Sequence, residues 1–235
     1  MDIPATIRKI KTELRLAMNG VASAYMRENG MNYKLNFGVE LPRLRAIAAE
    51  FPADHDLAQA LWKEDIRECK LLAAMLQPTD TFYPEIADIW VESMPNAEIA
   101  QHTVQNLFCR LPYASQKAYE WIASEDEMFQ QCGYLILARL FMQGLHPNER
   151  SADEFLDQAR TALHASLPVR RAAVSALQKY QTLDEAAREA EEKILRETGI
   201  QPEIIELRSL ETCLSLACQG LGFTFSFDIC ETCFH

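Results

Sequence analysis

The chain has 235 residues, 49% of them hydrophobic, and carries 34 acidic against 23 basic side chains, a formal net charge of −11. This length can bury one continuous core without disulfides or metals, so we expect a single domain over residues 1–235. The acidic excess argues against indiscriminate nucleic-acid binding, because non-specific affinity for DNA comes from Lys and Arg that neutralise phosphates. Residues 1–45 depart from this balance, with eight Lys or Arg against four Asp or Glu.

Hydropathy and cysteine usage point to a soluble protein. No apolar stretch approaches the roughly 18 residues of a membrane-spanning helix, and the first residues are charged and amphipathic. The seven cysteines are scattered, mostly in apolar helical surroundings such as Cys69, Cys109 and Cys132, which is typical of reduced, buried thiols. We therefore expect a cytoplasmic protein with no membrane partner and no disulfide framework.

Apolar residues recur at helical spacing along almost the whole chain, and no segment alternates with period two for long enough to predict a sheet. The predicted fold class is therefore all-α. Two helices are expected over residues 4–30, followed by a loop over 32–38. Five helix pairs follow, at 41–51 with 56–77 (broken near Asp65), 82–94 with 96–111, 114–123 with 126–144, 151–165 with 167–181, and 184–197 with 202–219.

Several helix starts carry sequence signals. A hydroxyl residue followed three positions later by Glu can form a capping box, which satisfies free backbone N–H groups. This pattern predicts helix N-termini at Ser124, Ser151 and Thr182. Prolines tolerated in a first helical turn mark further starts, at Pro42, Pro168 and Pro202.

Helix pairs with a pitch of roughly 30 to 40 residues cannot each bury an apolar face alone, so they stack on their neighbours. The predicted architecture is a right-handed α-α superhelix, a HEAT/ARM-like solenoid whose concave wall is lined by one helix of each pair. We compared the formal charges of the first and second helix of each pair from residue 56 onward, with the break near Asp65 taken as a boundary. The charges of the first helices sum to −10 and those of the second helices to +3. This split predicts a neutral to basic inner wall, although solvated faces could also produce it by chance.

One motif, FGVELPRLRAIA, runs from Phe37 to Ala48. Further segments follow it in order: Trp62, IRECKLLA over 66–73, Thr103-Val104, Lys117-Ala118 and WIAS over 121–124. Together they resemble the bacterial HEAT-like DNA alkylation repair glycosylases, the AlkD-like family, over most of the chain. The resemblance implies a protein that holds duplex DNA in a concave groove. Active members of that family hydrolyse the glycosidic bond of positively charged alkylated bases.

The family's mechanism implies an aspartate that stabilises positive charge on the sugar, two tryptophans that flank the lesion, and an arginine that faces the DNA backbone. At the matching positions this sequence has Gln105 for the aspartate, Gln101 and Ser175 for the tryptophans, and Gln131 for the arginine. A neutral amide cannot supply the charge that an oxocarbenium-like transition state requires, although it could still hydrogen-bond a base, a phosphate or water. We therefore assign no catalytic residue.

DNA contacts are expected from basic and amide side chains on the second helices of the pairs. The candidates are Arg67, Lys70, Gln101, Gln105, Gln131, Arg170, Arg171 and Lys179. Ion pairing with neighbouring acids is the alternative for the cations, and a solvated face is the alternative for the glutamines. Glu98 and His102 lie close to Gln105 in the sequence, but a helix-dipole role for Glu98 and a structural role for His102 are favoured.

Residues 221–235 are predicted to form an extended tail that contains cysteines. Cys230, Cys233 and His235, together with Cys213 and Cys218, could supply zinc ligands, but the spacing is not that of a zinc knuckle. No metal and no cofactor is therefore expected, with zinc as the alternative.

Three functions are compatible with these features. The leading hypothesis is an AlkD-like protein that binds duplex DNA, damaged or structured, in its groove without the family's glycosylase activity. The second is a protein-interaction scaffold, since an acidic solenoid without catalytic groups also suits a protein partner. The third is an active alkylpurine DNA glycosylase with displaced catalytic residues. The oligomeric state is not predicted.

Overall fold

The structure is a computed structural model that describes residues 2–31 and 33–200. The described helices belong to one compact unit, Met1–Thr198, which we call the first unit, and the second unit, Gly199–His235, lies almost entirely outside the described residues. Within the described residues the named elements are all helices, and a single bridge between Leu35 and Ile66 is the one β-type pairing. The all-α prediction is confirmed. The predicted helix over 202–219 and the tail over 221–235 lie outside the described residues.

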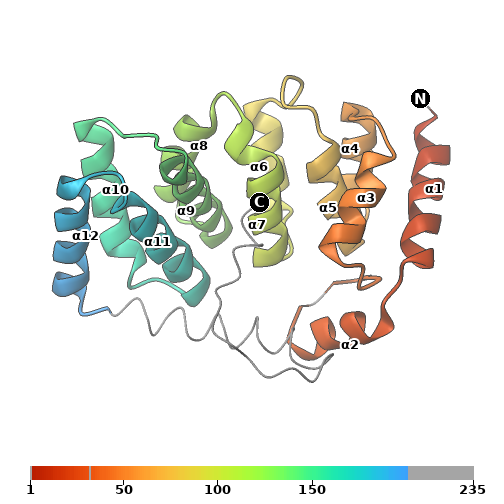
Figure 1. Ribbon diagram of the computed structural model, residues 1–235, viewed down its shortest axis with the longest axis horizontal. Coiled ribbons are helices and arrows are strands. Elements are labelled where there is room, and N and C mark those ends of the chain that lie inside the picture. The colour runs from red at the N-terminus through yellow and green to blue at the C-terminus, as the bar shows by residue number, and fades with distance from the viewer. Residues whose placement is uncertain (1, 32, 201–235) are drawn as a thin grey trace. The chain divides into compact units, whose positions relative to one another are not determined.

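The helices of the first unit follow one another side by side in chain order, with α2 lying across the direction of its neighbours (Figure 1). Their bounds are α1 (Ile3–Leu16), α2 (Gly20–Glu28), α3 (Leu41–Ala49), α4 (His55–Trp62), α5 (Arg67–Leu76), α6 (Pro84–Glu92), α7 (Ala97–Asn106), the 3₁₀ turn η1 (Phe108–Arg110), α8 (Ala114–Ile122), α9 (Glu127–Met142), α10 (Glu149–Ala162), α11 (Leu167–Tyr180) and α12 (Glu185–Thr198).

Most of these helices belong to one of two layers. We call α1, α4, α6, α8 and α10 the first layer, and α3, α5, α7, α9 and α11 the second layer. Successive members of the second layer pack on each other, while α4 packs on α5, α8 on α9 and α10 on α11. This is the packing expected of stacked helix pairs, in which each pair buries the apolar face of the next.

The predicted break near Asp65 is confirmed, because α4 ends at Trp62 and α5 begins at Arg67. The pairing is more divided than predicted, since α4 and α5 pack on each other and α5 also packs on α3. The chain is extended at Ile66, and the backbone N–H of Arg67 donates to the carbonyl of Leu35 at 3.0 Å. That hydrogen bond to a distant loop ends one helix and starts the next, which leaves α3 in the second layer against α5.

Hydrogen bonds between neighbouring pairs recur at a sequence separation of 31. The indole N–H of Trp62 donates to Ser93 Oγ at 2.9 Å, and that of Trp90 donates to Gln59 Oε1 at 3.2 Å, both across 31 residues. The hydroxyl of Tyr113 donates to the carbonyl of Phe82 at 2.6 Å with the same separation. The recurring interval agrees with the predicted repeat pitch.

Tryptophans form the core of the first layer. The rings of Trp62 and Trp90 stack with centroids 3.9 Å apart and planes 3° from parallel, and Phe82 packs edge-on against Trp90. Further along, Trp121 packs on Phe108 at 5.4 Å. Large aromatic side chains supply much of the apolar burial, and their polar atoms must still be satisfied. Neighbouring first-layer helices are therefore joined by stacking and by the indole hydrogen bonds together.

The predicted capping boxes do not form the helix N-caps. The caps are Asp126, Asn148 and Asp184, whose side chains accept hydrogen bonds from backbone N–H groups of the first turn at 2.8 to 2.9 Å. A carboxylate or amide oxygen caps as well as a hydroxyl, so a nearby Asp or Asn can take the position. The Ser124 hydroxyl instead accepts from the backbone N–H of Asp126 at 3.1 Å. The prolines at 42 and 168 do lie in first turns, as predicted, and Pro202 is outside the described residues.

Candidate nucleic-acid interface

Two of the predicted phosphate contacts, Arg67 and Lys70, are buried inside the protein. Arg67 is 3% exposed and Lys70 is 8% exposed. Both lie on α5, and their positions three residues apart correctly place them near one helix face. The two side chains bond to the loop before α3, to α7 and to the end of α4, and they also line a pocket with Tyr33 and Asp65. Most of each cation is therefore engaged within the protein, and contact with DNA stays a prediction for both.

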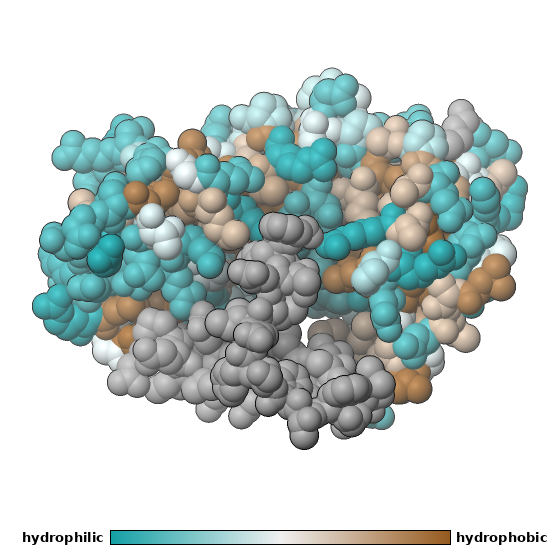
Figure 2. All heavy atoms as spheres, viewed as in Figure 1, coloured by the Kyte–Doolittle hydropathy of each residue, from teal (hydrophilic) through white to brown (hydrophobic). Residues whose placement is uncertain are grey.

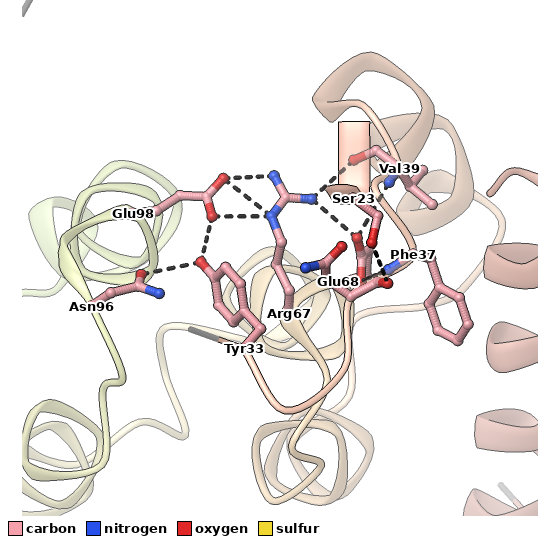
Figure 3. Close-up of polar contacts among 9 residues, drawn as sticks. Ser23, Tyr33, Phe37, Val39, Arg67, Glu68, Asn96 and Glu98 are labelled. Atoms are coloured by element: carbon pink, nitrogen blue, oxygen red, sulfur yellow. Dashed lines mark hydrogen bonds and ion pairs between the residues drawn. The ribbon is translucent and has the colours of Figure 1, made fainter. Parts of the chain in front are cut away.

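Arg67 joins two carboxylates from different helices (Figure 3). Its Nη2 atom donates to Glu98 Oε1 at 2.6 Å, and its Nη1 atom donates to Glu68 Oε1 at 3.1 Å and to the carbonyl of Val39 at 3.0 Å. Tyr33 donates from its hydroxyl to Glu98 as well. The network thus ties the loop before α3 to α5 and α7.

The electrostatics of this network keep Glu98 ionised. Burial alone raises the pKa of this carboxyl, but hydrogen bonds and charge from Arg67, with the Tyr33 hydrogen bond, outweigh burial and hold the pKa below its usual value. Burial and the same carboxylate raise the pKa of Tyr33 well above its usual value, so the phenol stays protonated and donates. Glu98 is therefore an anion that is fully engaged within the protein.

Lys70 stabilises the end of α4. Its Nζ atom donates to the carbonyl of Trp62 at 2.8 Å and lies 4.7 Å from the centre of the Trp62 ring. Trp62 is the last residue of α4, and the last carbonyls of a helix have no partner within it. Burial lowers the pKa of Lys70. The lysine is thus a buried helix cap with a cation–π contact.

The four residues that stand at the family's functional positions lie on adjacent second-layer helices. Gln101 is exposed and Gln105 half-buried on α7, Gln131 is buried on α9, and Ser175 is half-buried on α11. Because α7 packs on α9 and α9 on α11, the structure brings these helices together in the order that the resemblance implies. The structure thus places these four neutral polar residues on neighbouring helices, and their match to the family's functional positions stays a prediction.

Two arginines that the sequence analysis did not single out flank this site. Burial lowers the pKa of His102 on α7, and Glu98 acts in the opposite direction. Three arginines add to the lowering of this pKa, namely Arg67, Arg45 and Arg139. Arg45 lies exposed on α3 and Arg139 lies half-buried on α9. Charges from three second-layer helices therefore converge around His102.

Neither Arg45 nor Arg139 has an ion pair within residues 2–31 and 33–200. Lys117 of α8, by contrast, contacts Asp88 at 2.7 Å and Glu120 at 2.9 Å. The helical spacing of apolar residues in the sequence could have identified the two arginines, because each lies outside the apolar face of its second-layer helix. Their free positive charge agrees with the predicted basic character of the second helices.

The cations of α11 are only partly exposed. Arg170 donates from Nη2 to the carbonyl of Ala165 at 3.1 Å, and the Nε atoms of Arg170 and Arg171 are buried without a hydrogen-bond partner in the described part of the chain. Lys179 is half-buried in the last turn of the same helix. These three residues remain candidates for phosphate contact, at the opposite end of the second layer from Arg45.

The described ranges hold neither a metal site nor a membrane span. No group of three or more His, Cys, Asp or Glu residues there is arranged to hold a metal ion. No helix of that part of the chain has the length and apolar character needed to cross a membrane. The cysteines and His235 of the last residues lie outside the described ranges, so zinc binding there stays an untested alternative.

Comparison with solved structures finds one described as "A new family of proteins related to the HEAT-like repeat DNA glycosylases with affinity for branched DNA structures". The match has a TM-score of 0.72 and 17% sequence identity, and it covers 84% of this chain and 83% of that chain. No curated protein matches the sequence. A likeness at this identity establishes the fold, a HEAT-like helical repeat, as predicted.

The family is established by the sequence over a long span. The family model described as "DNA alkylation repair enzyme" matches residues 10–190, which includes the loop before α3 and every second-layer helix. This chain therefore belongs to the DNA alkylation repair enzyme family.

Proposed function

We propose that this protein binds DNA along the second layer and does not cleave glycosidic bonds by the family's mechanism. The observation that carries the proposal is that Arg45 on α3 and Arg139 on α9, which have no ion pair within the described residues, lie in the row of packed helices that includes α7, the helix of Gln105. Such cations attract phosphates even when the net charge of a protein is negative, because charges farther from the contact than the screening length contribute little to binding. The binding surface would be the concave groove of the solenoid.

The proposed loss of catalysis follows from the groups near Gln105. Hydrolysis through an oxocarbenium-like transition state needs an anionic group beside the sugar. Glu98 is on the same helix, but Arg67 and Tyr33 already occupy its carboxylate. His102 cannot supply a negative charge, because an imidazole is either neutral or cationic, and burial and the nearby arginines lower its pKa and so favour the neutral form. The described residues around Gln105 thus offer polar contacts without a free anion.

Branched DNA is the first class of DNA to test, because the structural neighbour is described as having affinity for it. A curved row of helices that contacts the backbone reads DNA shape more than sequence. Undamaged duplex and alkylated duplex are the comparison ligands.

The test is DNA binding measured by fluorescence anisotropy over a range of salt concentrations. The double variant Arg45→Gln/Arg139→Gln is expected to weaken binding and to reduce the slope of log affinity against log salt by about 0.9 for each phosphate that the protein no longer neutralises. Arg160→Gln is the matched control, since Arg160 lies on α10 and pairs with Asp157 at 2.8 Å. If the wild-type protein shows no salt-sensitive binding near physiological ionic strength, the DNA hypothesis fails and a protein partner becomes the leading one.

Catalysis has its own assay, the release of methylated bases from alkylated DNA. We expect none from the wild-type protein. Release that disappears in Gln105→Ala or in Glu98→Gln would instead establish an active glycosylase with displaced catalytic residues.

A further inference from the structure

The short helix α2 is fixed in place although it contributes no buried residue. Its N-cap, Asn19, accepts from the backbone N–H of Ala22 at 3.1 Å, and the backbone N–H of Asn19 donates to the carbonyl of Phe37 at 2.9 Å. Ser23 donates from its hydroxyl to the carbonyl of Asn36 at 3.3 Å. Contacts with the loop before α3, rather than a core of its own, hold this helix.

The loop itself is rigid. Gly38 has a φ of +68°, and a Cβ atom at this position would lie 2.2 Å from the carbonyl oxygen of Asn19, so the loop is pressed against the start of α2. Glu68, which is fully buried, accepts from the backbone N–H groups of Phe37 at 3.1 Å and of Val39 at 3.2 Å (Figure 3). The buried network of Arg67 and Glu68 therefore fixes the corner between α1 and α2.

This corner exposes an apolar tip. Leu16, Met18 and Val21 are 77%, 60% and 82% exposed, and Val21 and Leu16 are the two most exposed large hydrophobic side chains of the described residues. Figure 2 shows hydrophobic surface beside the ends of α1 and α2, on an otherwise mostly hydrophilic face. Three exposed apolar side chains within six residues of one corner make it a candidate contact surface.

Cations and acids both lie beside the tip. Arg15 is exposed next to Leu16, while Arg43 lines a depression of about 490 Å³ beside Met18 together with Glu40 and lies 3.7 Å from Glu13. The whole segment 1–45 has eight basic against four acidic residues, in a chain whose net charge is −11. A second copy of this chain would bring like charges together at this surface, whereas a polyanion would neutralise them.

We propose that Leu16, Met18 and Val21 form a wedge that packs against the unstacked bases of a DNA branch point. This inference rests on the proposed DNA binding and names the element that would recognise a branch. In continuous duplex the bases are stacked and paired, and an apolar wedge must break stacking to enter. At a branch point that cost is largely absent. Leu and Met are side chains that DNA-binding proteins insert between bases, while flanking cations hold the phosphates.

The experiment compares a three-way DNA junction that carries 2-aminopurine at the branch with a duplex of one arm. The variant Leu16→Gln/Met18→Gln/Val21→Gln is measured beside Ile89→Gln, which removes a side chain that is 60% exposed on α6. Because the replaced side chains are exposed, both variants are expected to unfold at the wild-type temperature. Affinity is measured by anisotropy, base environment by 2-aminopurine fluorescence, and oligomeric state by sedimentation.

The wedge predicts a loss of about tenfold in junction affinity for the triple variant, which corresponds to the packing of roughly one base. Duplex affinity should be unchanged, and the 2-aminopurine signal of the wild-type complex should disappear. Ile89→Gln should behave as the wild type.

Unchanged junction binding by the triple variant overturns the wedge but leaves DNA binding intact. Absence of DNA binding by the wild type overturns the proposed function itself. A wild-type dimer that the triple variant abolishes, or a lowered unfolding temperature of the triple variant, shows that protein covers the tip and also overturns the wedge.

Discussion

At the scale of single residues, the charged side chains of this protein are of two kinds: some are buried in hydrogen bonds and ion pairs within the fold, and others are exposed at the surface. Arg67 shows the first kind, since each of its terminal nitrogens and Nε donates to a carboxylate or a carbonyl. Burying a guanidinium costs several kcal/mol of desolvation, which only a complete set of such hydrogen bonds offsets. A basic residue in a DNA-binding family is thus no evidence of a phosphate contact until its environment is known.

Replacing Arg67 should therefore reduce stability strongly. Arg67→Gln leaves Glu98 and Glu68 buried without their cation, and we expect the free energy of unfolding to fall by about 3–5 kcal/mol. Urea denaturation measures this change. The matched control is Lys34→Gln, because Lys34 pairs with Asp65 at 3.1 Å on the surface and should cost less than about 1 kcal/mol. Equal losses for the two variants would contradict the buried network.

Glu98 should contribute to the acid sensitivity of the protein. Because its folded-state pKa lies below the usual value of 4.5, its contribution to stability is complete above that pH. The contribution is lost as the pH falls through the lowered pKa of the folded state. Glu98→Gln should be less stable than the wild type at pH 7 but lose less further stability between pH 5 and pH 3. Unfolding free energies measured across this range, with Glu92→Gln as an exposed control, test the difference. Parallel curves for the wild type and Glu98→Gln would count against the ionised, bonded carboxylate.

At the scale of elements, close packing fixes how paired helices meet. Gly133 lies on α9 against α8, and a Cβ atom there would come within 2.7 Å of Ile122 Cγ2 and 2.8 Å of the carbonyl oxygen of Ala118. No side chain larger than hydrogen fits unless the two helices separate. The pair α8 and α9 is thus held at its spacing by one glycine.

Two glycine-to-alanine substitutions make this testable. Alanine favours a helix over glycine by about 1 kcal/mol, so Gly133→Ala would stabilise the protein if packing did not matter. We expect it instead to destabilise by about 1–3 kcal/mol through overpacking. Gly20→Ala in α2 meets nothing within 4 Å and should leave stability unchanged or raise it by less than about 1 kcal/mol. Thermal unfolding of both variants measures the contrast, and a stabilised Gly133→Ala would refute the close approach of the two helices.

At the scale of the whole molecule, the net charge of −11 conceals an uneven distribution. Both layers contain paired cations, such as Lys117 and Arg160 in the first and Arg67 in the second, whereas Arg45 and Arg139 of the second layer have no ion pair within the described residues. At physiological ionic strength the screening length is about 8 Å, so charges on the two layers act largely independently. A protein with an acidic average can therefore present a basic surface.

Removing two acids and removing two cations should therefore change the affinity for DNA by unequal amounts. Glu85→Gln/Glu92→Gln removes two exposed acids from α6 in the first layer, and Arg45→Gln/Arg139→Gln removes two cations from the second layer. If net charge governed DNA binding, the two double variants would shift the affinity equally in opposite directions. We expect only a slight gain from the first and a large loss from the second, in anisotropy at 0.15 M salt. Symmetrical shifts would argue against a localised interface.

The helices, the repeat and the family could all be predicted from the amino-acid sequence. Helical spacing and turn residues depend on neighbours along the chain, so bounds such as those of α9 and α11 were predicted to within a few residues. The FGVELPRLRAIA motif and the segments after it carry the family resemblance. The same comparison places neutral residues, Gln101, Gln105 and Gln131, at positions where the resemblance implies functional groups.

Which charges are available to a partner depends instead on how the repeats pack together. The separation of Arg67 and Lys70 in the sequence places them near one face of α5, but the loop and the helix end to which they bond come from elsewhere in the chain. The same holds for the packing of α4 on α5 and for Glu98, whose partner lies 31 residues away. Local periodicity is set by adjacent residues, whereas burial and ion pairing are set by contacts between repeats, which one sequence does not specify.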